Sequence, residues 1–369
     1  MSRILLILFF PLGTLVSCIK KEAPNSEADI VTCFIEGDVL KADPKIENNK
    51  VTLMLKKGVD VTSLAPQFTL TPGATIAPES GTTRDFTQAQ SYIVTSEDRQ
   101  WQKEYLITCT LESISTYYSF ENSELEDNKY YIFYEVSDNG ELQYIWASGN
   151  AGFRLTAANA PPEDYPTVSW PAGKKGKCLK LETRSTGALG ALVKKPIAAG
   201  NLFMGEFSAT DALANPLKAT RFGIPFDKQP LHLIGFYKYK AGERFTDENN
   251  QEVPGEKDIF DIYSILYETD ENVKYLDGSN ALDSPNLIAV ARINPNQKSD
   301  PEYSESDFWS FFNIPFQLME GKEIDPIKLA NGQYNISIVL TSSVKGGEFK
   351  GAVGSILMVD ELELICLER

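Results

Sequence analysis

The stretch Ala198–Lys240, AAGNLFMGEFSATDALANPLKATRFGIPFDKQPLHLIGFYKYK, decides the fold of this chain. It predicts two β-strands joined by a turn region that proline residues mark. Side chains of a strand alternate between its two faces, and in the second strand neither face is polar. One face carries Leu231, Leu233, Tyr237 and Tyr239, and the other carries His232, Ile234, Phe236 and Lys238. We therefore expect a strand of a large sandwich, covered on one side and lined with rings on the other.

Aromatic rings beside Lys, Asp and Asn side chains suit a carbohydrate ligand. The C–H faces of a sugar stack on rings, and its hydroxyl groups bond to fixed polar side chains. The formal net charge of −16 over 369 residues argues against nucleic acid or an anionic membrane surface as a partner, whereas a neutral glycan is compatible with it. The single histidine, His232, excludes most zinc-hydrolase and histidine-dyad mechanisms.

Short apolar runs separated by turn residues predict an all-β chain with two domains. Residues 30–112 indicate an immunoglobulin-like sandwich, with strands at 30–35, 50–55, 67–70, 91–95 and 105–110. Residues 113–369 indicate a jelly roll, with strands at 130–136, 142–146, 178–183, 202–207, 231–239, 259–267, 287–292, 333–340 and 355–365. No convincing helix competes with these strands. Loops at 157–177, 240–258 and 294–310 are expected to wall a concave face.

Strand 259–267 gives the sharpest hypothesis for a site. Its even positions predict an apolar face between the sheets, and its odd positions mix rings with the carboxylate of Asp261. The alternatives are a glycan cleft or an outer face under a loop, with Asp261 in a salt bridge. Polar residues beside glycines and rings recur at other strand ends. The predicted carbohydrate-binding residues are Trp146, Asn150, Arg184, Asn201, Arg221, Tyr237, Tyr239, Asp261 and Tyr263.

The last strand contains a break in its apolar alternation. Leu357 and Val359 occupy odd positions, whereas Leu362 and Leu364 occupy even ones, which predicts a β-bulge at Asp360-Glu361. Galactose-binding-like modules often open with Phe-Glu and close with an Asp-rich strand that share a Ca²⁺. This resemblance makes Glu121 and Asp360 candidate Ca²⁺ ligands, with a carboxylate that satisfies the bulge backbone as the alternative for Asp360. No cofactor is otherwise expected.

The sequence leaves two roles open for four cysteines and two for one tryptophan. Cys33, Cys109, Cys178 and Cys366 either pair or act as small buried hydrophobic residues, and a bridge between Cys33 and Cys109 is conceivable because they lie in the first and last strands of the first domain. Trp101, in a hairpin between Gln100 and Gln102, is expected to pack at the end of the sandwich; the alternative is a sugar platform.

The N-terminus predicts a lipoprotein signal peptide over residues 1–18. Arg3 precedes an apolar stretch that is too short for a good transmembrane span. Leu15-Val16-Ser17-Cys18 then matches a bacterial lipobox, in which cleavage leaves a lipidated cysteine. Residues 19–29 form a polar tether. A plain secretory signal with an incidental cysteine is the alternative.

From about Trp146 onward the sequence closely resembles the Bacteroidetes family called the putative carbohydrate metabolism domain. The matching runs are WASGN, TRSTGALG, IAAGNLFMGEF, TRFGIPFDKQPLHLIGFYKYKAGE, DIFDIYSILYE, VKYLDG and SSVKGGEFKGAVGSILMVDELEL. The run from Phe68 to Thr108 resembles immunoglobulin-like modules behind the lipid anchor of Bacteroidetes surface proteins. The resemblance implies a spacer module followed by a jelly roll with a sugar pocket, and it supplies no agreed catalytic residues.

We therefore expect a monomeric lipoprotein of the outer membrane, on its periplasmic or outer face, whose jelly roll binds an oligo- or polysaccharide. Rings would stack on sugar faces, and Arg184 and Asp261 would bond hydroxyl groups. A glycoside hydrolase with a carboxylate pair in the same cleft is one alternative, although no acid and nucleophile can be assigned from sequence. A structural or adhesive envelope protein without a small ligand is the other.

Overall fold

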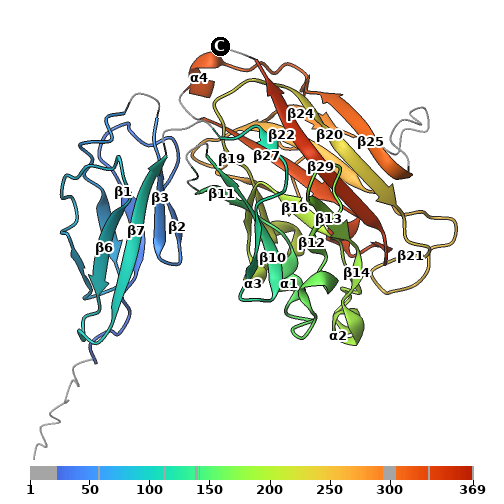
Figure 1. Ribbon diagram of the computed structural model, residues 1–369, viewed down its shortest axis with the longest axis horizontal. Helices are drawn as coiled ribbons and strands as arrows, with labels where there is room; N and C mark the ends of the chain where they lie inside the picture. Colours follow the sequence, from blue (N-terminus) through green and yellow to red (C-terminus); the bar gives the residue numbers. More distant parts are fainter. Residues whose placement is uncertain are drawn as a thin grey trace, which may run out of the picture. The chain divides into compact units, whose positions relative to one another are not determined.

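A computed structural model describes residues 23–56, 59–110, 114–137, 140, 142–293, 305–330 and 333–367. The predicted signal peptide and Cys18 lie outside these residues. The chain is all-β, as predicted, and it divides into two compact units: most residues up to Cys109 form the first, and Thr110 begins the main part of the second (Figure 1). Within the described ranges, no helix is long and apolar enough to cross a membrane.

The first unit is a sandwich of a two-stranded and a five-stranded sheet. The small sheet pairs β1 (Ile30–Phe34) with β4 (Gln67–Leu70). The large sheet has the order β2 (Lys45–Glu47), β3 (Lys50–Met54), β7 (Gln102–Thr110), β6 (Gln90–Thr95) and β5 (Thr75–Ala77). Alternate residues of these strands face inward, and the most deeply buried are Val51, Leu53, Tyr92, Val94, Tyr105 and Ile107.

One detail of the predictions is wrong, and one open alternative is decided. Trp101 packs little against the sandwich, because 63% of its surface is exposed at the turn between β6 and β7. Cys33, Cys109, Cys178 and Cys366 are free thiols, so of the two alternatives the cysteines are unpaired and no bridge joins Cys33 and Cys109. Burial raises the pKa of the Cys33 and Cys109 thiols to about 12, which keeps both neutral at ordinary pH.

The second unit is a sandwich of two six-stranded sheets, which we name the β20 sheet and the β22 sheet after a central strand of each. The β20 sheet has the order β12 (Thr167–Trp170), β13 (Cys178–Glu182), β29 (Ile356–Cys366), β20 (Pro230–Lys240) and β25 (Ser306–Pro315), with β8 (Tyr117–Tyr118) beside β29. The β22 sheet has the order β16 (Asn201–Phe203), β27 (Tyr334–Thr341), β22 (Asp261–Glu268), β24 (Leu287–Arg292) and β26 (Gln317–Leu318), with β19 (Ile224–Pro225) beside β27.

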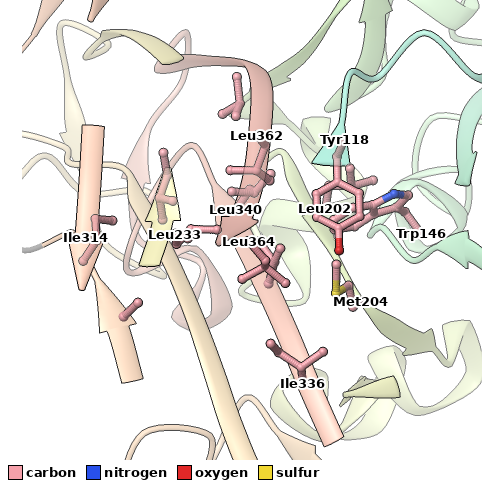
Figure 2. Packing of buried hydrophobic residues seen from close by; sticks show 14 of the residues in the cluster. Tyr118, Trp146, Leu202, Met204, Leu233, Ile314, Ile336, Leu340, Leu362 and Leu364 are labelled. Atoms are coloured by element: carbon pink, nitrogen blue, oxygen red, sulfur yellow. The ribbon is translucent and has the colours of Figure 1, made fainter. Parts of the chain in front are cut away.

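The core lies between these two sheets. Leu233 and Leu364 of the β20 sheet and Ile336 and Leu340 of the β22 sheet belong to one cluster of buried side chains (Figure 2). The even positions of β22, such as Ile262 and Leu266, face this core as the alternation predicted. Burial of this apolar surface is the main stabilising contribution to the unit.

Smaller elements cover parts of the sandwich. Three-stranded sheets are formed by β9 (Ser123–Glu126), β10 (Tyr130–Val136) and β11 (Leu142–Trp146), and by β17 (Gly205–Phe207), β18 (Thr220–Phe222) and β23 (Leu276–Asp277). Two-stranded sheets pair β14 (Arg184–Ser185) with β15 (Ile197–Ala198) and β21 (Phe245–Thr246) with β28 (Gly351–Ala352). The helices are short: α1 (Asn150–Phe153), α2 (Gly187–Leu192), α3 (Ala209–Ala214), α4 (Pro326–Ala330), and the 3₁₀ turns η1 (Pro162–Asp164), η2 (Pro216–Ala219) and η4 (Gly346–Glu348).

Two predictions about strands have opposite outcomes. The bulge in β29 is confirmed: Ile234 pairs with Glu363 but Phe236 pairs with Asp360, so an extra residue lies on β29, and Glu361 has a φ of 50°. The predicted loop 294–310 is wrong in its described part, because β25 begins at Ser306 and pairs along β20.

Candidate functional site

Four of the nine predicted binding residues lie in the packed interior. Trp146 is 2% exposed, Tyr237 0% and Tyr239 3%, and all three belong to the core between the sheets. Asn150 is 0% exposed, and its amide bonds the backbone of Tyr131 and Thr167. These four residues offer no surface to a ligand, so their assignment to a sugar site is corrected. Tyr237 and Tyr239 point inward because β20 turns its odd positions toward the core.

The two predicted arginines lie on other parts of the surface, within ion pairs. Arg184, on β14, lies 3.2 Å from Glu182 and donates to the backbone carbonyl of Glu163. Arg221, on β18, lies 3.3 Å from Asp211 and stacks over the ring of Tyr275, 5.3 Å from its centroid. Both guanidinium groups are thus held by neighbouring acidic residues.

Asn201, Asp261 and Tyr263 come together on the outer face of the β22 sheet. Thr341 of β27 pairs with Asn201 on one side and with Asp261 on the other, and Tyr263 follows two residues later on the same face of β22. Asn201 accepts a hydrogen bond from the backbone N–H of Gly149 at 2.8 Å and donates to the carbonyl of Ala199. Three of the residues in the predicted set are therefore neighbours on one face of the β22 sheet.

This group is closed rather than open. Asp261 is 3% exposed, and Arg292 binds its carboxylate through Nε at 3.0 Å and Nη2 at 2.6 Å. Burial raises the pKa of Asp261, and the Arg292 guanidinium opposes that rise. Farther along the same face, Phe203, Ile265 and Tyr267 are buried in a cluster with Phe222 of β18 and Leu276 of β23. The sheet of β17, β18 and β23 therefore covers much of the outer face of the β22 sheet.

The outer face of the β20 sheet carries partly exposed rings. Even positions of β20 point away from the core, so Phe236 and Lys238 lie on this face. Phe236 pairs with Phe311 of β25, and the two ring centroids are 5.3 Å apart. Trp309 follows on β25, and Trp170 lies on the far edge strand β12. We name this surface the ring face, defined by Trp170, Phe236, Trp309, Phe311 and the lysines Lys174, Lys180 and Lys238.

A lysine ammonium lies beside three of these rings. Lys174 Nζ is 4.1 Å from the centroid of the Phe236 ring, and Lys238 Nζ is 4.9 Å from that of Trp309. Lys180 Nζ is 4.7 Å from the Trp170 centroid and forms a 2.7 Å ion pair with Glu182. Such contacts between ammonium groups and rings are attractive and place hydrogen-bond donors next to apolar surface.

The two candidate calcium ligands instead hold a turn at the ring face. Asp360 Oδ2 accepts hydrogen bonds from the backbone N–H groups of Lys174 and Lys175, and its Oδ1 accepts from Glu361 N–H. Glu121 Oε1 accepts from Lys177 N–H at 2.9 Å. These oxygens are already bonded to N–H groups, and no cluster of three or more metal-ligating side chains occurs in the described part of the chain. The alternative for Asp360, a carboxylate that satisfies the bulge, is confirmed.

Glycines permit the approach of these carboxylates to the turn. A Cβ atom on Gly173 would lie 2.8 Å from Asp360 Oδ2, and a Cβ on Gly176 would collide with Glu121 Oε1. Gly176 also has a φ of +65°, which disfavours other residues. The sequence Gly173-Lys-Lys-Gly176 therefore encodes a turn that presents lysines.

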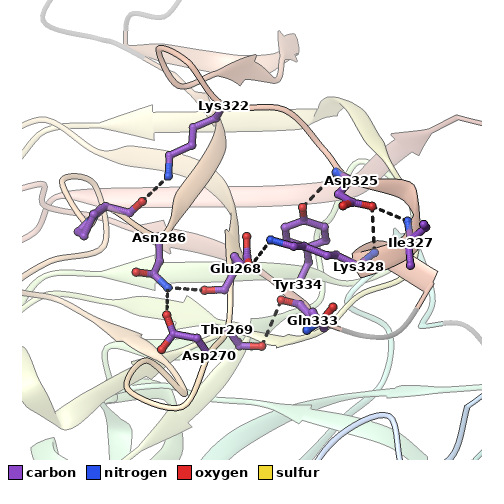
Figure 3. A network of polar contacts seen from close by, with 11 residues as sticks. Glu268, Thr269, Asp270, Asn286, Lys322, Asp325, Ile327, Lys328, Gln333 and Tyr334 are labelled. Carbon is purple, nitrogen blue, oxygen red and sulfur yellow. Dashed lines mark hydrogen bonds and ion pairs between the residues drawn. The ribbon is translucent and has the colours of Figure 1, made fainter.

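In a second polar network, the polar groups bond to one another. Lys328 Nζ donates to Glu268 Oε1 at 2.6 Å, and Asp325 accepts from the backbone N–H groups of Ile327 and Lys328 (Figure 3). The Asn286 amide bridges the Glu268 carbonyl and the Asp270 carboxylate (Figure 3). These bonds attach α4 to the ends of β22 and β27, so we assign this network to structure.

The sequence contained a signal for the ring face. The alternation in β20 predicts one covered face and one ring-lined face, and the even face carries Phe236 and Lys238. The predicted site used Tyr237 and Tyr239, which lie on the opposite face. The predicted set does not contain Trp309, which lies in the predicted loop 294–310, or Phe311, which follows that loop directly. Trp309, Phe311 and Asn313 alternate along Ser306–Pro315, but Phe308 and Phe312 place rings on the other face as well.

Comparisons with known proteins agree with a carbohydrate-related role. A crystal structure described as a putative glycoside hydrolase from Bacteroides thetaiotaomicron VPI-5482 is 48% identical, covers 95% of this chain and 100% of its own, and has a TM-score of 0.83. Another, described as a putative glycoside hydrolase from Bacteroides vulgatus ATCC 8482, is 44% identical, covers 69% of this chain and 100% of its own, and has a TM-score of 0.64. No curated protein matches the chain.

Two family models match consecutive parts of the sequence. Residues 30–109 match the model described as SGBP, N-terminal. Residues 119–365, more than half of the chain, match the model described as the putative carbohydrate metabolism domain. The chain belongs to the putative carbohydrate metabolism domain family.

Proposed function

We propose that this protein binds a glycan chain on the ring face of its second unit without cleaving it. The observation that carries the proposal is the row of partly exposed rings on one sheet face, three of them with an adjacent lysine. Phe311 is 52% exposed, a large exposure for an apolar ring on a strand. Rings of this kind stack on the C–H faces of sugars, and ammonium groups donate to sugar oxygens.

The shape of the ring face suits a chain of sugars. The rings lie on β25, β20 and β12, and β25 and β12 are the two edges of a five-strand path. Neighbouring strands lie about 4.8 Å apart, so these edges are separated by roughly 19 Å. An extended oligo- or polysaccharide could contact several rings along this distance. This proposal replaces the pocket expected from sequence with a sheet face that is partly covered by the turn of Lys174 and Lys175.

Binding without hydrolysis is favoured by the carboxylates. Glycoside hydrolysis requires two carboxyl groups that flank one bond. On the ring face, Asp360 is 0% exposed with its oxygens occupied by N–H groups, and Glu182 is paired with Lys180 and Arg184. Glu363 is partly exposed on this face, and one carboxylate does not make a pair. In the Asn201 group, Asp261 is the carboxylate of the predicted set and is occupied by Arg292.

We also propose that Cys18 carries a lipid that anchors the protein in the outer membrane. The support is the lipobox Leu15–Cys18 after a short apolar stretch. Metabolic labelling with a palmitate analogue should mark the wild-type protein but not Cys18→Ser. Labelling of Cys18→Ser to the same extent would contradict the anchor.

Glycan binding is tested by a glycan-array screen of the protein without residues 1–18, followed by titration calorimetry of any hit with single variants. Trp309→Ala should weaken binding by about fivefold, because loss of one stacked ring removes about 1 kcal/mol. Tyr275→Ala is the matched control, because Tyr275 is a 45% exposed ring beside a cation, Arg221, on another surface.

The outcomes separate the alternatives. Wild-type affinity of Trp309→Ala for every hit would remove the ring face as the site. New reducing ends in the glycan after incubation would show hydrolysis and overturn non-catalytic binding. Absence of binding to any glycan would favour a structural or adhesive protein.

A further inference from the structure

We propose that the glycan bound by the ring face is acidic and carries carboxylate or sulfate groups. This inference rests on the proposed function, since it specifies the ligand of the same site. It starts from the hydrogen-bonding chemistry that the ring face presents. A neutral sugar hydroxyl both donates and accepts hydrogen bonds, whereas a carboxylate or sulfate only accepts them.

The polar groups at the centre of the ring face act mainly as donors. Lys174 and Lys238 have no carboxylate within ion-pair distance among the residues that the structure describes, and each lies over a ring instead. Two of the acceptors nearby are already used. Asp360 is bonded to three N–H groups, and Asn313 Oδ1 lies 2.7 Å from His232 Nδ1. A ligand with acceptor-only groups therefore matches this surface.

Lysines elsewhere in this acidic chain are of two kinds. Lys257 pairs with Glu305, Lys328 with Glu268, and Lys345 with Glu256, whereas Lys218 and Lys274 have no ion pair among the described residues. Lys174 and Lys238 also lack one, and their ammonium groups lie over rings of the ring face. The net charge of −16 opposes an anionic ligand at long range, so the attraction has to act within about 10 Å of these two lysines. Unneutralised ammonium groups beside rings raise the local concentration of anionic ligands and strengthen their binding at low salt.

Asp360 and Glu121 act in this proposal as positioning residues. Their bonds to the N–H groups of Lys174, Lys175 and Lys177 fix the turn that places the Lys174 ammonium over Phe236. The carboxylates at this face oppose an anionic ligand. Asp360 and Glu121 are bonded to the N–H groups of the turn, and Lys180 neutralises Glu182. Glu363 is partly exposed on the same sheet face opposite Ile234. Removal of the Glu363 charge should therefore strengthen binding.

The experiment uses affinity electrophoresis against matched pairs of polysaccharides. The pairs are polygalacturonate with its methyl ester, chondroitin sulfate with desulfated chondroitin, and carrageenan with desulfated carrageenan. We expect an acidic member to retard the protein more than its partner does, and the pair that responds identifies carboxylate or sulfate. Lys174→Met with Lys238→Met should lower affinity for that member by about tenfold at low salt, since each exposed ion contact contributes up to about fivefold.

Two further variants sharpen the result. Lys218→Met changes the net charge like each lysine substitution but lies on η2, away from the ring face, so it should bind as wild type. Glu363→Gln should strengthen acidic binding by about twofold. Equal retardation by acidic and neutral members, unaffected by the lysine substitutions, would overturn the acidic assignment and leave glycan binding intact. No retardation by any polysaccharide, together with an empty glycan array, would reject the proposed function itself.

Discussion

The two outer faces of the second unit differ in what covers them. The β22 sheet has a layer of β17, β18 and β23 over its outer face, and its ring of Tyr263 is only 8% exposed beside the Asp261–Arg292 pair. The β20 sheet leaves Phe236, Trp309 and Phe311 partly exposed with lysines at their edges. In the amino-acid sequence, the strands of both faces carry aromatic residues next to charged ones.

This difference shows that ring-and-charge patterns have two distinct meanings. On the covered face, the charges neutralise each other, as in the bidentate contact of Arg292 with Asp261. On the ring face, the ammonium groups of Lys174 and Lys238 form no ion pair with any described residue, and each lies over a ring. The first arrangement contributes to stability and the second is available to a ligand.

The largest expected effect compares two adjacent residues of β20. Tyr237→Ala should lower the free energy of unfolding of the second unit by about 4 kcal/mol, because it empties a fully buried site. Phe236→Ala should cost only about 1 kcal/mol, since its ring is partly exposed, yet it should weaken glycan binding. Urea denaturation and calorimetry measure the two quantities; equal destabilisation by both variants would contradict the assignment of inner and outer faces.

The next effect concerns Glu135, which accepts a 2.8 Å hydrogen bond from Trp146 Nε1. Burial raises the pKa of Glu135 from 4.5 to about 7. The folded state therefore keeps a proton that the unfolded state loses above about pH 4.5, and stability should fall as pH rises from 4.5 to 7, by up to about 3 kcal/mol. Glu135→Gln keeps an acceptor for Trp146 and should remove this pH dependence; parallel pH profiles of the two proteins would contradict it.

A smaller effect is expected at Asp261. Asp261→Ala should destabilise the second unit by about 2 kcal/mol, less than a fully buried pair would, because 38% of the Arg292 side chain is exposed and can turn to water. Asp127→Ala breaks an exposed ion pair with Arg154 and should cost less than about 0.5 kcal/mol. Glycan affinity should be unchanged in both. A specific loss of affinity in Asp261→Ala would move the site to the covered face.

The smallest effect should follow the addition of calcium. Asp360 and Glu121 accept hydrogen bonds from backbone N–H groups. Addition of about 5 mM Ca²⁺, or of excess chelator, should therefore shift the melting temperature by less than about 1 °C. Differential scanning fluorimetry measures this shift. A rise in melting temperature that saturates with Ca²⁺ and is absent in Asp360→Asn would show that Asp360 does bind calcium.

Much of the fold was predictable because alternation reports directly on burial. The strands β10, β11 and β24 begin and end where the apolar runs do, and the shift from Val359 to Leu362 indicated the bulge. β25 was missed because the run Phe308–Phe312 contains rings on both faces, which obscures a period of two. The lipid anchor, the glycan and the membrane location stay predictions.

The site was less predictable because coverage is a tertiary property. Asp261 and Tyr263 have the pattern of a ligand-binding face, but the layer that buries this face comes from residues 205–222 and 276–277, distant in sequence. Tyr237 and Phe236 are equally aromatic neighbours, and only the position of the second sheet decides which one faces the interior. Alternation identifies two faces of a strand without saying which is inward.

The order of strands in the β20 sheet has a consequence for folding. β29, the last of the described strands, lies between β13 and β20 in the middle of that sheet. Without β29, the pair of β12 and β13 and the pair of β20 and β25 have no strand to join them. The ring face is therefore complete only when this last strand has inserted.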